Sequence, residues 1–248
     1  WLEKAPLDDA TLSLEVRAAA LGAAGGIAYY THDDVDGAER FWREGLELRR
    51  VQDDPHELGA ALSWLSSIAW RRGDFDGAIA YHKEALPLFE QAGAEALLLN
   101  ELHWLGDAYR DRGNFDEAER ALEETVTRAR ELGFDQQLTS TLHSLGDLSL
   151  DRRDPDAALP QFAEALAYAV STGSRRVQIY CVAGIGCALL QQGDDRVAAR
   201  LWGIAEDQER RLGFRMLLNE RQRYEHLMSG AHERLGAAPG DIGQLAGA

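Results

Sequence analysis

A pattern that recurs every 40 residues constrains this chain more than any other feature. Steps of 40 from Gly106 meet only small residues, and steps from Ala118 meet only alanine. Two further series, which begin from Gly113 and Gly133, are rich in glycine. The four series are Gly26, Ser66, Gly106, Gly146, Gly186; Ala38, Ala78, Ala118, Ala158, Ala198; Asp33, Gly73, Gly113, Arg153, Gly193; and Asp53, Gly93, Gly133, Gly173, Gly213. A fixed period of this length indicates a stack of structural repeats.

Helix packing explains why the series have these compositions. A small residue on each helix lets the two backbones of a hairpin approach closely, while larger side chains fill the space beside them. The large positions are Leu65, Leu105, Leu145 and Ile185. Glycine suits the turn within a hairpin and the left-handed residue just past a helix end. The period leaves room for helices of about 16–18 residues, or about 25 Å each.

The third repeat resembles the tetratricopeptide signature of two antiparallel helices through Leu102, Leu105, Gly106, Tyr109, Ala118 and Leu122. We therefore expect an all-α fold, a right-handed tetratricopeptide-like superhelix of five extended helix pairs with a C-terminal capping helix. The expected order is the end of a preceding helix or linker at 1–10, repeats at 11–53, 54–93, 94–133, 134–173 and 174–213, a capping helix at 214–236 and a tail at 237–248. Asp74 and Asp154 are expected N-caps.

Charge and cysteine content narrow the function classes. A formal charge of −16 and a pI near 4.8 oppose binding to a phosphate backbone, so we expect no nucleic-acid contact. We interpret the acidity mainly as solvated outer helix faces. Cys181 and Cys187 lie six apart on one expected helix and cannot bridge, which indicates a reducing compartment. No apolar run approaches about 18 residues and no signal peptide is seen, so we expect a cytoplasmic chain without a membrane contact. Because it begins at Trp1, we expect it to be part of a longer protein.

In tetratricopeptide arrays the first helix of each pair lines a concave groove, and that register identifies candidate binding residues here. The positions are mostly polar or aromatic, which predicts a groove that can hydrogen-bond a protein or peptide partner or a small polar effector. The residues we select as effector- or peptide-binding are Trp70, Asn100, His103, Asp107, Arg110, Ser140, His143, Asp147, Asp151 and Tyr180. Further groove positions include Ala23, Ile27, Tyr30, Ser63, Ser67, Cys187 and Gln191.

Other chemistries for these residues are weaker. The His103–Asp107 and His143–Asp147 pairs repeat at the period and have the residue types of a zinc site, but such pairs usually hydrogen-bond each other or a ligand. Ser140 could complete a triad only with His143 three residues away on the same helix, which does not suit acyl transfer. Phosphate-loop, nucleophile-elbow and metalloprotease motifs are absent from the sequence. We therefore expect no catalytic residue, no metal and no cofactor, and no enzyme activity in this fragment.

Two end segments carry a narrower resemblance. The opening WLEKA looks like the junction after the ATP-binding module of large bacterial regulators, and the closing Ala198–Gly236 segment is similar to the end of the same group. That group comprises predicted ATPases and LuxR-type or SARP-type transcriptional regulators. The resemblance implies a sensor or interaction region whose repeats bind an inducer or partner. The sequence departs from the group at Leu217-Leu218-Asn219, where a proline is common, and ATP-binding and DNA-binding motifs are absent. The alternative is a stand-alone scaffold that clasps a peptide without a small effector.

Overall fold

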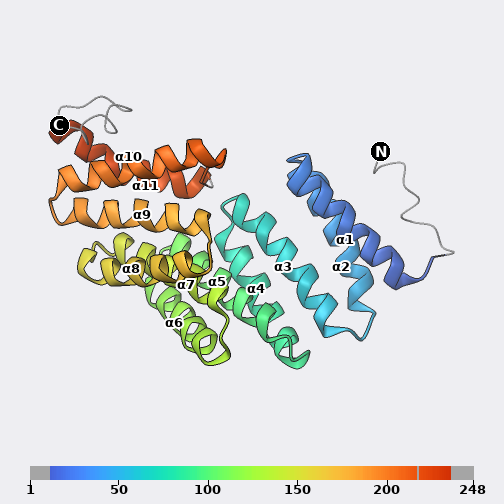
Figure 1. Cartoon of the computed structure of the whole chain (residues 1–248). Helices are drawn as coiled ribbons and strands as arrows, with labels where there is room; N and C mark the ends of the chain where they lie inside the picture. The colour runs from blue at the N-terminus through green and yellow to red at the C-terminus, as the bar shows by residue number, and fades with distance from the viewer. Residues whose placement is uncertain (1–11, 217, 236–248) are drawn as a thin grey trace. The chain divides into compact units, whose positions relative to one another are not determined.

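The computed structural model describes residues 12–216 and 218–235, with side chains for 12–216 and 220–229. These residues form eleven helices and no strand (Figure 1). The expected segments 1–10 and 237–248 lie outside the described residues. The helices are α1 (Leu14–Thr31), α2 (Val35–Arg50), α3 (Pro55–Arg71), α4 (Phe75–Gln91), α5 (Glu95–Arg112), α6 (Phe115–Leu132), α7 (Asp135–Asp151), α8 (Pro155–Ser171), α9 (Arg175–Gln191), α10 (Asp195–Leu212) and α11 (Leu218–Leu235). Each is 16 to 18 residues long, as the period predicts.

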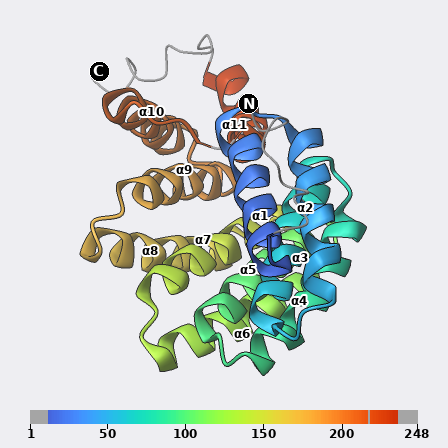
Figure 2. The ribbon, with the colours of Figure 1, turned by 90° about the vertical axis from the view of Figure 1, so that its right-hand side faces the viewer.

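The chain divides into two compact units, 1–121 and 122–248, with the division inside α6. In the first unit α1 packs on α2 and α3 on α4, and α2·α3 and α4·α5 contacts join successive hairpins. In the second unit α7 packs on α8 and α9 on α10, and α9 contacts both helices of the α7–α8 hairpin (Figure 2). The last helix, α11, contacts α9 and α10. No described helix combines the length and the apolarity that a bilayer crossing requires.

Left-handed backbone residues mark the turns at the expected period. Positive φ occurs throughout the series of Gly113, including the two members that are not glycine, Asp33 (φ 56°) and Arg153 (φ 59°). In the series of Gly133 the exception is Asp53, which does not adopt positive φ. The connection there is longer, since α2 ends at Arg50 and α3 begins at Pro55. Proline also holds the preceding residue in extended backbone, so this turn takes another path.

Aspartate caps begin most second helices of the hairpins. Asp74 Oδ1 accepts the Gly77 N–H at 2.9 Å, and Asp154 Oδ1 accepts the Ala157 N–H at 3.1 Å, which confirms both expected N-caps. Each such cap stabilises its helix by about 1 kcal/mol. The same bond is made by Asp34, Asp54 and Asp194.

Small residues allow close helix contacts, but not always at the expected positions. The alanine series is fully buried in every hairpin. A Cβ at Gly146 would lie 2.6 Å from the Phe162 ring, as expected for a close approach. At Gly26, however, a Cβ would meet nothing within 4 Å, and the close approach in the first hairpin is made by Gly25 against Trp42. The expectation for Gly26 is wrong because the bulky Trp42 side chain reaches α1 one residue earlier.

Candidate functional site

The predicted binding residues of the first unit form a chain of polar contacts between α3 and α5. Trp70 Nε1 donates to Asp111 Oδ2 at 2.8 Å, and Arg110 Nη2 donates to Asp111 Oδ1 at 3.2 Å. Arg110 Nη1 also lies 3.3 Å from Asp107 Oδ1. Asp107 Oδ2 is 3.4 Å from His103 Nε2. Four predicted residues therefore lie together, with Asp111 as a member that the sequence did not single out.

Burial separates the members of this set that a partner could touch from those that support them. His103, Asp107 and Arg110 are buried, whereas Trp70 and Asn100 are half-buried. Burial lowers the pKa of His103, and the nearby Asp107 carboxylate only partly opposes that effect. The His103 imidazole is therefore neutral at pH 7 and acts through hydrogen bonds and ring contacts.

A second polar contact in the first unit was not predicted. Glu101 on α5 is 1% exposed, and its Oε1 lies 2.7 Å from His82 Nδ1 on α4. Its other oxygen, Oε2, accepts a hydrogen bond from Ser63 Oγ on α3 at 2.6 Å. A buried carboxylate needs such partners, because burying an unpaired charge is costly. One side chain thus joins three helices of the first unit.

The 40-residue period of the sequence could have predicted the contact between Glu101 and His82. The positions at 40-residue steps from Glu101 are fully buried, and those at 40-residue steps from His82 are large and buried. Two polar residues at such core positions predict that they meet. The two series are Leu21, Ala61, Glu101, Thr141, Cys181 and Trp42, His82, Leu122, Phe162, Trp202.

In the second unit, the predicted His143 and Asp147 of α7 meet a tyrosine from the last helix. Tyr224 Oη donates to Asp147 Oδ1 at 2.7 Å and lies 3.0 Å from His143 Nε2. All three side chains are buried. Burial, reinforced by the Asp147 carboxylate, raises the pKa of Tyr224 well above its ordinary value, so the phenol keeps its proton as a donor.

An arginine beside this tyrosine extends the contact along α7. Arg223 Nη2 lies 3.4 Å from Asp147 Oδ2, and Arg223 Nη1 lies 3.6 Å from Asp151 Oδ2. Tyr180 of α9, also a predicted residue, places its ring edge-on at 5.5 Å from His143. The predicted residues of the second unit therefore gather under α11, with one exception. Ser140 donates instead within its own helix, to the Gln136 carbonyl at 3.2 Å.

Two groove-register side chains of α1, and a tryptophan beside the groove on α5, remain open to solvent. Tyr30 and Ile27 on α1 are 76% and 43% exposed. Trp104 on α5 is 39% exposed and stacks on His103 with ring centroids 5.3 Å apart. We name Ile27, Tyr30, Trp70, Asn100 and Trp104 the first-helix face. The corresponding positions of the second unit, on α7 and α9, are largely buried.

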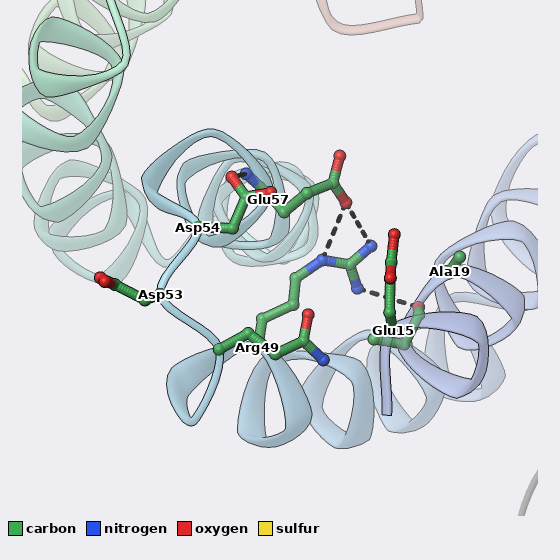
Figure 3. Close-up of a pocket in the computed structure, with 8 residues that line it drawn as sticks. Glu15, Ala19, Arg49, Asp53, Asp54 and Glu57 are labelled. Atoms are coloured by element: carbon green, nitrogen blue, oxygen red, sulfur yellow. Dashed lines mark hydrogen bonds and ion pairs between the residues drawn. The ribbon is translucent and has the colours of Figure 1, made fainter. Parts of the chain in front are cut away.

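Surface pockets lie elsewhere. One of about 630 Å³ lies in the first unit, where Arg49 donates to the Ala18 carbonyl at 2.9 Å and to Glu57 Oε2 at 2.8 Å (Figure 3). Another, of about 580 Å³, lies in the second unit around Arg221 and Glu206. Neither is lined by a predicted site residue. The acidic rim of the first pocket, with its arginine already paired, identifies no ligand by itself.

Metal and thiol chemistry find little support in the described part of the chain. Within it, no three His, Cys, Asp or Glu side chains are grouped closely enough to hold a metal ion. Cys181 and Cys187 are buried free thiols, as their spacing predicts. Burial raises the pKa of Cys181 to about 12 and that of Cys187 also upward, with Asp147 adding to both effects.

Comparison with known proteins supports the repeat assignment. Residues 95–169, which span most of the expected third and fourth repeats, match the tetratricopeptide repeat family. BtubC (BKLC) from P. vanneervenii is similar in structure, with TM-score 0.67, 20% identity, and coverage of 87% of this chain and 94% of that one. A Rap protein solved with competence and sporulation factor has TM-score 0.73 and 13% identity, with coverage of 96% of this chain and 68% of that one. Aspartyl phosphate phosphatase F from Bacillus subtilis has TM-score 0.63 and 11% identity, with coverage of 96% of this chain and 61% of that one. No curated protein sequence matches the chain.

These likenesses confirm an all-α, tetratricopeptide-like solenoid fold. Tetratricopeptide folds generally bind protein or peptide partners and are generally non-enzymatic. The chain is accordingly a helical-repeat protein.

Proposed function

We propose that this chain binds a protein or peptide segment on the first-helix face of its first unit. The observation that carries the proposal is the exposure of Ile27 and Tyr30 at groove-register positions and of Trp104, which stacks on the groove residue His103. Tyrosine and tryptophan are among the commonest anchors of protein–protein contacts, and exposed large side chains are candidates for that role. The Rap structure, which contains competence and sporulation factor, supports a partner-binding use of the fold.

The two kinds of residue on α5 have different roles in this proposal. Asn100 and Trp104 contact the partner directly, together with Trp70 of α3. The buried residues His103, Asp107 and Arg110 hold α5 and α3 in register, because their contacts run through Asp111 to Trp70. The partner presents apolar anchors and a net positive charge, since the chain carries −16 and opposite charges speed association.

Peptide selection followed by affinity measurement tests this proposal. A peptide is selected from a random display library on the intact chain and measured by fluorescence anisotropy. Tyr30→Ala and Trp104→Ala are each expected to lower the affinity for the selected peptide roughly tenfold or more, as the truncation of an anchor residue does. Val170→Ala is the control, because Val170 is equally apolar and exposed but lies on α8 of the second unit. Unchanged affinity in both face variants would contradict the proposal.

A small polar effector is the second candidate, favoured by the density of charge on α5. His103, Asp107 and Arg110 supply a donor, an acceptor and a cation within two helical turns, and because all three are buried, an effector would bind them only by displacing their present contacts. A thermal-shift screen of metabolites separates the candidates, because only an effector-binding chain is stabilised by a small ligand. A hit should lose its shift in Asp107→Asn, and a hit that keeps it binds elsewhere.

We also propose that the chain is the sensor region of a bacterial multidomain transcriptional regulator. The resemblance of the Ala198–Gly236 segment to the end of the LuxR-type and SARP-type group supports this. Partner binding would then shift the balance between two assemblies of the regulator. The full-length sequence tests it: a phosphate-binding loop upstream and a helix-turn-helix at one end are expected, and a parent with neither rules out this role.

A further inference from the structure

The last helix covers groove-register positions of the second unit. Asp147 lies 40 residues after Asp107 and 120 after Ile27, so the three share one register position. That position is exposed to solvent on α1 and buried on α5, whereas on α7 it is bonded to Tyr224 of α11. Cys187 occupies it on α9 and shares a buried cluster with Tyr224 and Met228.

Helix α11 contacts more of the second unit than a helix that only covers the last hairpin would. In a solenoid each unit contacts its immediate neighbours, so a terminal helix need only cover the last hairpin. Helix α11 does contact α9 and α10, but Tyr224 and Arg223 also bond to α7 in the hairpin before. The helix therefore crosses the register face of α9 to reach α7.

The contact is polar where it meets α7. A phenol hydroxyl is shared between His143 and Asp147, and Arg223 approaches Asp147 and Asp151. Apolar side chains of similar volume would usually stabilise a permanent cover at least as well as buried polar pairs. Aromatic and arginine anchors surrounded by polar contacts are instead typical of interfaces between separable partners.

We infer that α11 is an internal ligand that closes a binding face on α7 and α9, and that a helical segment of another protein with adjacent arginine and tyrosine replaces it. Departure of α11 removes the Tyr224 hydroxyl from His143 and Asp147 and the Arg223 guanidinium from Asp151. An arginine followed by a tyrosine would restore both contacts in the observed order. The inference concerns the second unit and does not depend on binding at the first-helix face.

Competition with the sequence of α11 itself tests the inference. A fluorescein-labelled peptide of residues 218–235 is titrated with three full-length chains: wild type, Tyr224→Ala and His226→Ala. A tethered segment outcompetes a free one, so the wild type should bind the peptide weakly. Tyr224→Ala releases the tether and should bind it at least about tenfold more tightly. His226→Ala, changed at an exposed position of the same helix, should match the wild type.

Specificity is checked with the peptide as well. A labelled peptide carrying Tyr224→Ala should not bind any of the three chains. Equal affinity of all three chains for the normal peptide, or no binding to a folded Tyr224→Ala chain, would overturn the inference.

Hydrogen exchange on the wild-type chain gives a second test that needs no variant. Amides of α11 should exchange faster than those of α9 through local opening, and excess peptide should reduce α11 protection while α7 stays protected. Equal protection of α11 and α9 would show that α11 is a permanent part of the fold. Sedimentation of the same samples shows whether the chain dimerises by exchanging α11. Such a dimer would mean that the face on α7 and α9 binds a second copy of this chain, which would overturn the inference.

Discussion

The tight packing around Phe162 makes Gly184→Ala a demanding test of the second unit. A Cβ at Gly184 on α9 would lie 2.5 Å from two carbons of the Phe162 ring. The same ring packs closely against Gly146 of α7, where a Cβ would lie 2.6 Å from it, so the ring is tightly held between two glycines. Overpacking of this kind costs about 1–3 kcal/mol, and the higher helix propensity of alanine returns about 1 kcal/mol. We expect a net loss of about 1 kcal/mol in the free energy of unfolding.

A double-mutant cycle identifies the cause of that loss. Phe162→Leu alone should destabilise the chain by leaving a cavity, but it also makes room for the new methyl group. The double variant should therefore lose less than the sum of the two single variants, with a coupling of about 1 kcal/mol or more. Gly26→Ala is the matched control, because its Cβ would meet nothing within 4 Å. That variant should gain about 1 kcal/mol from helix propensity.

Urea unfolding followed by far-UV circular dichroism measures these differences. The midpoint should fall in Gly184→Ala and rise in Gly26→Ala, with the slope of each transition unchanged. A neutral or stabilising Gly184→Ala, or a cycle whose effects simply add, would show that the Phe162 ring does not fill the space between α7 and α9.

Three further experiments test other parts of the fold. Arg153→Gly should raise the free energy of unfolding by about 1 kcal/mol in urea titrations, because Arg153 holds positive φ. Glu101→Ala should lower it by about 3 kcal/mol by leaving His82 unpaired, whereas the joint change of Glu101 and His82 to leucine should be close to neutral in the same assay. Cys181 has a folded pKa of about 12 against an ordinary 9.0, so the unfolded chain loses its thiol proton first and stability falls as pH rises above 9. Relative to Cys181→Ala, this loss should reach about 1 kcal/mol at pH 10, and parallel pH profiles would refute the burial argument.

The sequence was sufficient for the helices because each rests on local chemistry. Caps such as Asp74 and left-handed turns such as Gly113 act within a few residues, so their spacing alone located the hairpins. The exceptions depend on tertiary packing. Gly25 rather than Gly26 makes the close approach because of the position of the Trp42 ring, which no local pattern specifies.

The candidate site was predictable only on the helices that repeat. His143 and Asp147 could be placed on one face of α7, because i and i+4 positions share a face. Their partner Tyr224 lies 77 residues beyond Asp147, outside the period, and its contact depends on where α11 returns to the stack. The helical spacing of Tyr224 and Met228 indicates one inward side of α11, but nothing local indicates which residues of α7 that side meets.

The regular placement of left-handed residues also limits how such a chain can change over time. Positive φ recurs at Gly73, Gly93, Gly113, Gly133, Arg153, Gly173, Gly193 and Gly213, at intervals of 20 residues. One residue inserted within a helix would turn every later side chain of that helix by about 100°, since an α-helix has 3.6 residues per turn. The buried face would then point outward. Related sequences are thus expected to differ in length by whole helix pairs, while single substitutions change the side chains that each hairpin exposes.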